Sequence, residues 1–185
     1  MRRVCVFCGA SAGNDPRYAA AAADLGKALA ARSIEVVTGG GKVGLMGVVA
    51  DATLGAGGRV IGVIPRFLEE REVAHRGLSE LHVVESLHER KALMHELSDG
   101  FIVLPGGFGT LDELMESVTW AQLNLHAKPI GIVNVAGYFD ELLTFVEGAR
   151  RAGFIPAAHG EILTVRYDAT ALVDALTDER LPGGA

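Results

Sequence analysis

Residues 104–116 read Leu104-Pro105-Gly106-Gly107-Phe108-Gly109-Thr110-Leu111-Asp112-Glu113-Leu114-Met115-Glu116. The apolar run at residues 101–104 is typical of a buried strand, and the apolar spacing over residues 111–125 predicts a helix. Glycines let the backbone pass close to a ligand, and the free N–H groups at a helix start attract anions. The order of strand, glycine loop and helix therefore indicates an anion site, and a phosphate suits that site.

The rest of the chain alternates strand and helix patterns in the same manner. Strands are expected at residues 3–8, 34–38, 59–64, 81–84, 101–104, 129–135 and 162–165. Helices are expected at residues 17–32, 48–54, 86–97, 111–125, 138–151 and 169–176. This alternation predicts an α/β fold with a doubly wound, Rossmann-like, mostly parallel sheet and helices on both faces. We expect a single domain over residues 1–180 and a loose C-terminal tail over residues 181–185.

Composition narrows the classes of function. The 185 residues are 49% apolar, which suffices for one core, and the net charge of -6 argues against a nucleic-acid partner. We see neither a membrane-spanning run nor a signal-peptide pattern, and we expect a cytoplasmic protein without a membrane partner. Cys5 and Cys8 lie inside an apolar strand and are interpreted as core residues. The histidine spacings are not those of a metal site, and we expect neither a metal nor a cofactor.

Three acids, Asp112, Glu113 and Glu116, follow the glycines within two helical turns. Like charges repel at close range, so their clustering suggests a cationic neighbour. That neighbour is either an arginine from elsewhere in the chain or a substrate carbon that becomes positive during reaction. The alternative is a capping box of Thr110 and Glu113, which satisfies helix N–H groups and requires no ligand. The residues alone leave both interpretations open.

A second glycine run offers a rival function. Gly39, Gly41 and Gly44 satisfy the GxGxxG dinucleotide fingerprint between a strand and a helix. The next strand, however, ends in Pro65-Arg66 and not in the acid that would hold the ribose of NAD. We therefore expect no dinucleotide cofactor. Instead, these glycines should let their loop pack close under the loop at residues 105–110.

The segment from Pro105 to Glu113 resembles the PGGxGTxxE signature of the LONELY GUY (LOG) family, cytokinin riboside 5′-monophosphate phosphoribohydrolases. The similarity extends along nearly the whole chain in the family's order. It includes residues 5–9, 39–41, 44–47, 63–65, 89–91, 120–123 and 153–155. The resemblance implies a hydrolase that cleaves the N-glycosidic bond of adenine-type nucleoside 5′-monophosphates, namely cytokinin riboside 5′-monophosphates and AMP. The products would be a free base and ribose 5-phosphate.

The resemblance also implies the site residues. Arg90 would be catalytic, paired across the cleft with Glu113, which it keeps ionised while Glu113 stabilises the positive sugar carbon. The substrate contacts would be Glu72, Arg90, Lys91, Gly107, Phe108, Gly109, Thr110, Leu111, Asp112, Glu113 and Thr119. From its helical position alone, Arg90 would be interpreted as surface charge, pointing about 100° away from Lys91. Asp112 or water would protonate the departing base.

Several alternatives stay open at this point. Ser11 either donates to the phosphate or satisfies a turn, and Ala10 stands where most LOG-like sequences have a second serine. A nucleotide sensor that binds without catalysis and a lysine decarboxylase are rival functions, although none of the four lysines has a recognisable pyridoxal phosphate setting. The helix at residues 111–125 carries apolar residues beyond its core face, which favours a homodimer. These residues are Val118, Trp120, Leu123 and Leu125.

Overall fold

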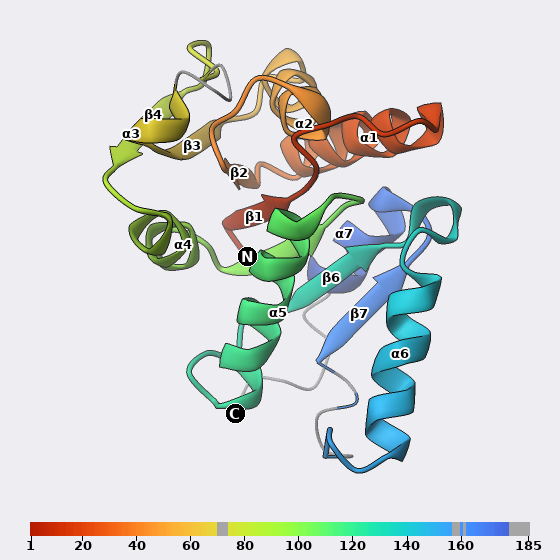
Figure 1. Ribbon diagram of the computed structural model, residues 1–185. Helices are drawn as coiled ribbons and strands as arrows, with labels where there is room; N and C mark the ends of the chain where they lie inside the picture. The colour runs from red at the N-terminus through yellow and green to blue at the C-terminus, as the bar shows by residue number, and fades with distance from the viewer. Residues whose placement is uncertain (70–73, 157–159, 161, 178–185) are drawn as a thin grey trace.

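The computed structural model describes residues 1–69, 74–156, 160 and 162–177. Within these residues, seven strands form one sheet in the order β4-β3-β2-β1-β5-β6-β7, and each pair is parallel (Figure 1). The strands are β1 (Arg3–Phe7), β2 (Glu35–Thr38), β3 (Val60–Pro65), β4 (Glu80–Val84), β5 (Gly100–Val103), β6 (Ile130–Val133) and β7 (Leu163–Arg166). The predicted doubly wound, Rossmann-like fold is confirmed.

Helices cover both faces of this sheet. They are α1 (Pro16–Ala31), α2 (Gly44–Gly55), α3 (Arg66–Glu69), α4 (Leu87–Glu96), α5 (Phe108–Gln122), α6 (Asp140–Arg151) and α7 (Ala169–Thr177), with a 3-10 turn η1 (Val135–Gly137). One face packs against α1, α2 and α7, and the other packs against α4, α5 and α6 (Figure 1). Alternate side chains of β1 enter the two cores, because successive residues of a strand point to opposite faces.

Local capping signals set where several helices begin. The Asp15 side chain accepts the N–H of Arg17 at 2.9 Å, and Pro16 occupies the first turn of α1, where its missing N–H costs nothing. At the start of α4, the Ser86 hydroxyl accepts the N–H of Glu89 at 3.1 Å. The predicted starts of these two helices are confirmed to within one residue. By contrast, α2 and α5 begin four and three residues earlier than predicted.

The topological switch point lies between β1 and β5. From β1 the chain turns to β2 on one side, and it returns on the other side as β5, so the loops after β1 and β5 diverge. Such a divergence leaves a crevice at the carboxyl ends of the strands, where ligands of open α/β sheets bind. The Gly9 N–H donates to the Pro105 carbonyl at 3.0 Å and joins the two loops. The predicted anion loop therefore lies at this crevice.

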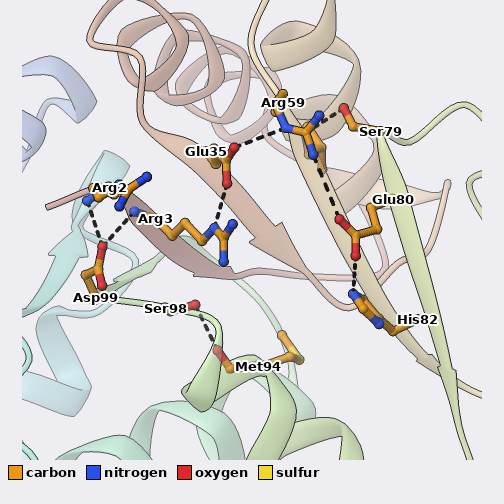
Figure 2. Close-up of polar contacts among 11 residues, drawn as sticks. Arg2, Arg3, Glu35, Arg59, Ser79, Glu80, His82, Met94, Ser98 and Asp99 are labelled. Atoms are coloured by element: carbon orange, nitrogen blue, oxygen red, sulfur yellow. Dashed lines mark hydrogen bonds and ion pairs between the residues drawn. The ribbon is translucent and has the colours of Figure 1, made fainter.

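A row of alternating charges crosses the amino ends of β1 to β4, at the opposite edge of the sheet. Figure 2 shows this row, which runs through Arg3, Glu35, Arg59, Glu80 and His82. The ion pair between Arg3 and Glu35 is 2.6 Å long, and that between Glu35 and Arg59 is 3.0 Å long. These side chains are partly exposed, so each pair contributes about 1 kcal/mol or less to stability. The row holds the strand starts together and leaves the other edge for the site.

The packing of the second glycine run differs from the prediction. A Cβ on Gly44 would lie 2.3 Å from the carbonyl carbon of Ala10, and Gly44 has a φ of +65° that favours glycine. A Cβ on Gly39 would lie 1.9 Å from Nη2 of Arg90. The expectation that this run packs under the loop at residues 105–110 is therefore wrong. It packs against the loop after β1 and makes room for an arginine.

The two cysteines are buried, as predicted, with Cys5 in one core and Cys8 in the other. Burial raises the pKa of both thiols, and the nearby charge of Glu113 raises it further. Thiols with raised pKa values are poor nucleophiles, which argues against a redox role. Among the described residues, no helix combines the length and the apolar character needed to cross a bilayer. Residues 181–185, the predicted tail, lie outside the described residues.

Candidate active site

The helix after the anion loop, α5, begins at Phe108, and this start tests the capping-box interpretation of the motif. Gly107 is the N-cap of α5, and among the described residues no side chain caps it. Thr110 therefore lies inside the first turn, and the alternative of a capping box with Thr110 as its first residue is wrong. The first amides of an α-helix have no carbonyl one turn back. Their N–H groups stay available for a ligand.

Three carbonyl groups of the glycine loop, at residues 105–107, accept hydrogen bonds from the protein. Pro105 accepts from the Gly9 N–H at 3.0 Å, and Gly107 accepts from the Leu111 N–H at 3.1 Å. The Gly106 carbonyl accepts from the Tyr138 hydroxyl at 2.6 Å. A carbonyl oxygen carries partial negative charge, so its engagement elsewhere removes repulsion from an incoming anion. The loop consequently presents donors and suits a phosphate.

A cavity of about 490 Å³ opens beside this loop. It lies between the loops after β1 and β5, at residues 9–13 and 105–107, with Tyr18, Leu45 and Tyr138 on its other sides. Its size is typical of small-molecule sites. The Ser11 hydroxyl oxygen lies at this cavity and accepts the Gly13 N–H at 3.4 Å. Ser11 thus stabilises a turn, and its own proton can still be donated, so both roles considered for it are compatible.

Arg90 is buried, with 7% of its surface exposed, and the expectation of a surface arginine from its helical position is wrong. Its Nε donates to the Val63 carbonyl at 3.2 Å, and its Nη2 donates to the Gly39 carbonyl at 3.0 Å. The charge of Glu113 raises the pKa of the Cys5 thiol, and the charge of Arg90 lowers it. Both charges therefore lie near the same part of β1. This placement is compatible with the predicted pairing of Arg90 and Glu113.

Lys91, the next residue, points to α5 and not into the sheet. Its Nζ lies 3.1 Å from the Asp112 carboxylate and 3.0 Å from the Glu116 carboxylate. Burial by itself would lower the pKa of Lys91, but the hydrogen bonds to Glu116 and Asp112 outweigh burial and raise it. Two of the three clustered acids thus have a lysine as their cationic neighbour. The predicted roles of Lys91 and Asp112 as substrate contacts stay predictions.

A second connection between α4 and α5 involves His95 and Ser117. The Ser117 hydroxyl donates to the Glu113 carbonyl at 2.8 Å, and it lies 3.1 Å from His95 Nε2. Because the hydroxyl proton is already used, Nε2 of His95 must carry the hydrogen in this contact. The His95 ring is buried against Trp120, with ring centroids 4.4 Å apart. Burial lowers the pKa of His95 to about 4, so the ring is neutral at pH 7.

The roles of His95 and Ser117 were not predicted, although the sequence contains a signal for them. His95 follows Lys91 by four positions and Ser117 follows Glu113 by four, so each pair lies on one helical face. Two contacts join α4 to α5: the ion pairs of Lys91 with Asp112 and Glu116, and the hydrogen bond between His95 and Ser117. They fix the spacing of the helices that carry Arg90 and Glu113.

The other predicted contacts have different positions. Phe108 begins α5, and its side chain is 91% exposed. Thr110 is buried below Gly106, where a Cβ would lie 2.1 Å from the Thr110 Oγ1, so only glycine fits at position 106. The Thr119 hydroxyl donates to the carbonyl of residue 115 within its own helix. Glu72, the predicted contact to the base, lies outside the described residues.

Sequence comparisons give two kinds of match. A family model described as possible lysine decarboxylase matches residues 46–176. A probable cytokinin riboside 5′-monophosphate phosphoribohydrolase of Oryza sativa subsp. japonica is 51% identical over 178 residues, 96% of this chain and 78% of that protein. A cytokinin riboside 5′-monophosphate phosphoribohydrolase of Arabidopsis thaliana is 48% identical over 178 residues, 96% of this chain and 84% of that protein.

Solved structures share the fold at much lower identity. The molybdenum cofactor carrier protein of Chlamydomonas reinhardtii superposes with a TM-score of 0.72 at 21% identity, over 95% of this chain and 98% of that one. The molybdenum cofactor binding protein of Rippkaea orientalis gives 0.70 at 19% identity, over 95% of both chains. At such identities the likeness establishes the architecture of the sheet and helices and nothing about the ligand.

Proposed function

We propose a function from a premise that the comparisons establish: this chain belongs to the LONELY GUY (LOG) family of cytokinin riboside 5′-monophosphate phosphoribohydrolases. The protein is a hydrolase that cleaves the N-glycosidic bond of adenine-type nucleoside 5′-monophosphates, including cytokinin riboside 5′-monophosphates and AMP. It releases the free base and ribose 5-phosphate. The observation that supports this function best is the glycine loop, where the carbonyls of Pro105, Gly106 and Gly107 accept hydrogen bonds from the protein and the first N–H groups of α5 have no carbonyl one turn back.

The substrate binds with its 5′-phosphate at residues 106–110 and its ribose beside Glu113. Binding energy from the phosphate, which does not react, helps to hold the anomeric carbon in the reactive position. A nucleoside without this phosphate should therefore react far more slowly.

Breaking the N-glycosidic bond builds positive charge on the anomeric carbon and the ring oxygen of the sugar. The Glu113 carboxylate stabilises this charge and orients the ribose hydroxyls or the attacking water. Arg90, buried next to the strand ends, keeps Glu113 ionised and contacts the substrate. The Asp112 carboxylate accepts a hydrogen bond from Lys91 Nζ at 3.1 Å. Asp112 or water supplies the proton for the departing base.

Chromatographic detection of free adenine tests this function. AMP should yield adenine and adenosine should yield far less; equal rates would contradict the phosphate anchor. Glu113→Gln should keep the fold and lose turnover, because the amide carries no charge to meet the cation. Retained turnover would reduce Glu113 to a structural residue. A protein that binds AMP but releases no adenine would be a nucleotide sensor, which is the alternative from another class.

A lysine decarboxylase is the second candidate, because the matching family model carries that description. Such an enzyme needs a neutral lysine amine to form a Schiff base with pyridoxal phosphate. Lys91 has a raised pKa and two carboxylate partners, and the Lys128 ammonium donates to the His95 carbonyl at 2.6 Å. Neither lysine is suited to that chemistry. Production of cadaverine from lysine in the presence of pyridoxal phosphate would restore this candidate.

The protein acts in the cytoplasm as a homodimer, and its interface includes the turn that follows α5, where the helix predicted to reach residue 125 has already ended at Gln122. Leu123 and Leu125 are 61% and 66% exposed, an unusual position for two leucines so close together. Trp120, expected at the same surface, instead packs partly against His95. Leu123→Glu should shift the protein from dimer to monomer in sedimentation velocity, because a charge at a dry interface is costly. A monomeric wild-type protein would contradict the dimer.

A further inference from the structure

We propose that Tyr138 is a positioning residue for phosphate recognition. Its hydroxyl holds the Gly106 carbonyl at 2.6 Å and thereby turns the N–H of Gly107 toward the nucleotide phosphate. This inference rests on the proposed function, because it concerns how the 5′-phosphate is bound. Tyr138 itself follows β6 and reaches the loop after β5 across 32 positions of sequence.

The peptide between Gly106 and Gly107 is the part of the loop that most needs an external anchor. Two glycines flank it, and glycine rotates about its backbone bonds with little steric resistance. A Cβ on Gly107 would meet no atom within 4 Å, so packing on that side does not restrain the peptide. The neighbouring carbonyls of Pro105 and Gly107 are held by backbone N–H groups, which no side-chain substitution removes. At Gly106 the anchor is a side chain, and it can be tested.

The orientation of this peptide decides the sign of the charge that meets the phosphate. The C=O and N–H of a trans peptide point in opposite directions, and no peptide bond among the described residues is cis. With the Gly106 oxygen turned to Tyr138, the N–H of Gly107 points away from Tyr138. A flipped peptide would put the oxygen in place of that N–H, and an oxygen repels phosphate. Donation from the hydroxyl also polarises the peptide and strengthens its N–H as a donor.

The surroundings of Tyr138 fix its hydroxyl relative to the sheet. Its ring meets the edge of Tyr18 from α1 with centroids 5.6 Å apart, and that of Phe139 with centroids 4.9 Å apart. The buried Asn134 accepts the N–H of Phe139 at 2.8 Å and holds the turn after β6. The turn contains Gly137 at a φ of +72°, where glycine is favoured. The anchor is thus mounted on a rigid part of the fold, as a positioning residue requires.

The decisive experiment is Tyr138→Phe, which removes one hydroxyl and keeps the ring contacts. We expect the KM for AMP to rise about tenfold, the loss typical of one hydrogen bond next to a charged ligand, while kcat changes by less than about twofold. Inhibition by inorganic phosphate should weaken by the same factor. The kcat/KM for adenosine, which has no phosphate, should be unchanged. A merely structural role of Tyr138 would lower the activity toward AMP and adenosine alike.

Tyr167→Phe is the matched control, because Tyr167 is 72% exposed in the loop after β7 and has no place in the proposed site. It should retain the wild-type KM for AMP. An unchanged KM in Tyr138→Phe, or equal losses with AMP and adenosine, would overturn the inference. Wild-type protein that binds AMP but releases no adenine would refute the proposed hydrolase alone. Calorimetric titration with AMP then tests the role of Tyr138. A Kd about tenfold weaker in Tyr138→Phe than in the wild-type protein supports the inference. The same Kd in both proteins, or no binding by the wild-type protein, overturns it.

Discussion

Acidification should destabilise this protein through His95. The ring is only 5% exposed and burial lowers its pKa from 6.5 to about 4, because a charged imidazole loses its hydration there. In the unfolded chain the ring binds a proton below about pH 6.5, whereas the folded protein keeps it neutral down to about pH 4. The unfolded state therefore binds more protons within this window. Stability that is present above pH 6.5 is lost as the pH falls, and the loss levels off below the folded pKa.

The magnitude follows from the two pKa values. At about pH 5 the unfolded ring is almost fully protonated and the folded ring almost fully neutral, which corresponds to about 2 kcal/mol for this one group. The full difference, reached below the folded pKa, is about 3 kcal/mol. Burial also lowers the pKa of His126, with a contribution from Lys128, so His126 adds to the loss in the same direction. A variant at position 95 is needed to separate the two histidines.

Urea denaturation at several pH values between 7 and 4 measures this effect. His95→Gln keeps an N–H donor for Ser117 but does not titrate. Between pH 7 and pH 5 its free energy of unfolding should therefore fall by about 2 kcal/mol less than that of the wild-type protein. His88→Gln, at an exposed position of the same helix, should follow the wild-type curve. Equal pH dependence in wild type and His95→Gln would show that the ring is hydrated or charged in the folded protein. The reasoning about its burial would then be refuted.

Two substitutions test the other contacts around the site. Gly39→Ala should reduce kcat for AMP by about a hundredfold in steady-state assays, because the new Cβ would lie 1.9 Å from Arg90 Nη2 and must displace the guanidinium. Gly55→Ala is the control, because a Cβ there meets no atom within 4 Å. An unchanged kcat in Gly39→Ala would argue against a catalytic Arg90. Lys91→Met should lower the free energy of unfolding by about 1–3 kcal/mol in urea, because two carboxylates lose their partner. Unchanged stability would mean that the ion pairs of Lys91 between α4 and α5 do not contribute to the free energy of unfolding.

Residue spacing alone was sufficient to predict the architecture and the anion loop. Strand and helix patterns depend on neighbours within about ten positions, so they can be recognised from the sequence without knowledge of the fold. The glycine loop between β5 and α5 belongs to the same class of signal. For this reason the seven strands, the six longer helices and the parallel sheet were predicted from the sequence, whereas the short helix α3 and the 3-10 turn η1 were not. The start of α5 was predicted three residues too late, because its N-cap, Gly107, has no side chain that would signal a helix start.

Contacts between distant positions required the tertiary structure. Arg90 is buried because β2 and β3 end beside α4 and offer it two carbonyls, an arrangement set by the strand order and absent from the pattern of α4 itself. The hydrogen bond between His95 and Ser117 joins residues 22 positions apart in the sequence, and that between Tyr138 and Gly106 joins residues 32 positions apart. Such pairs form only when the sheet brings separate loops and helices to one edge. Local spacing thus determined which elements exist, and the order of strands around β1 decided which side chains meet at the crevice.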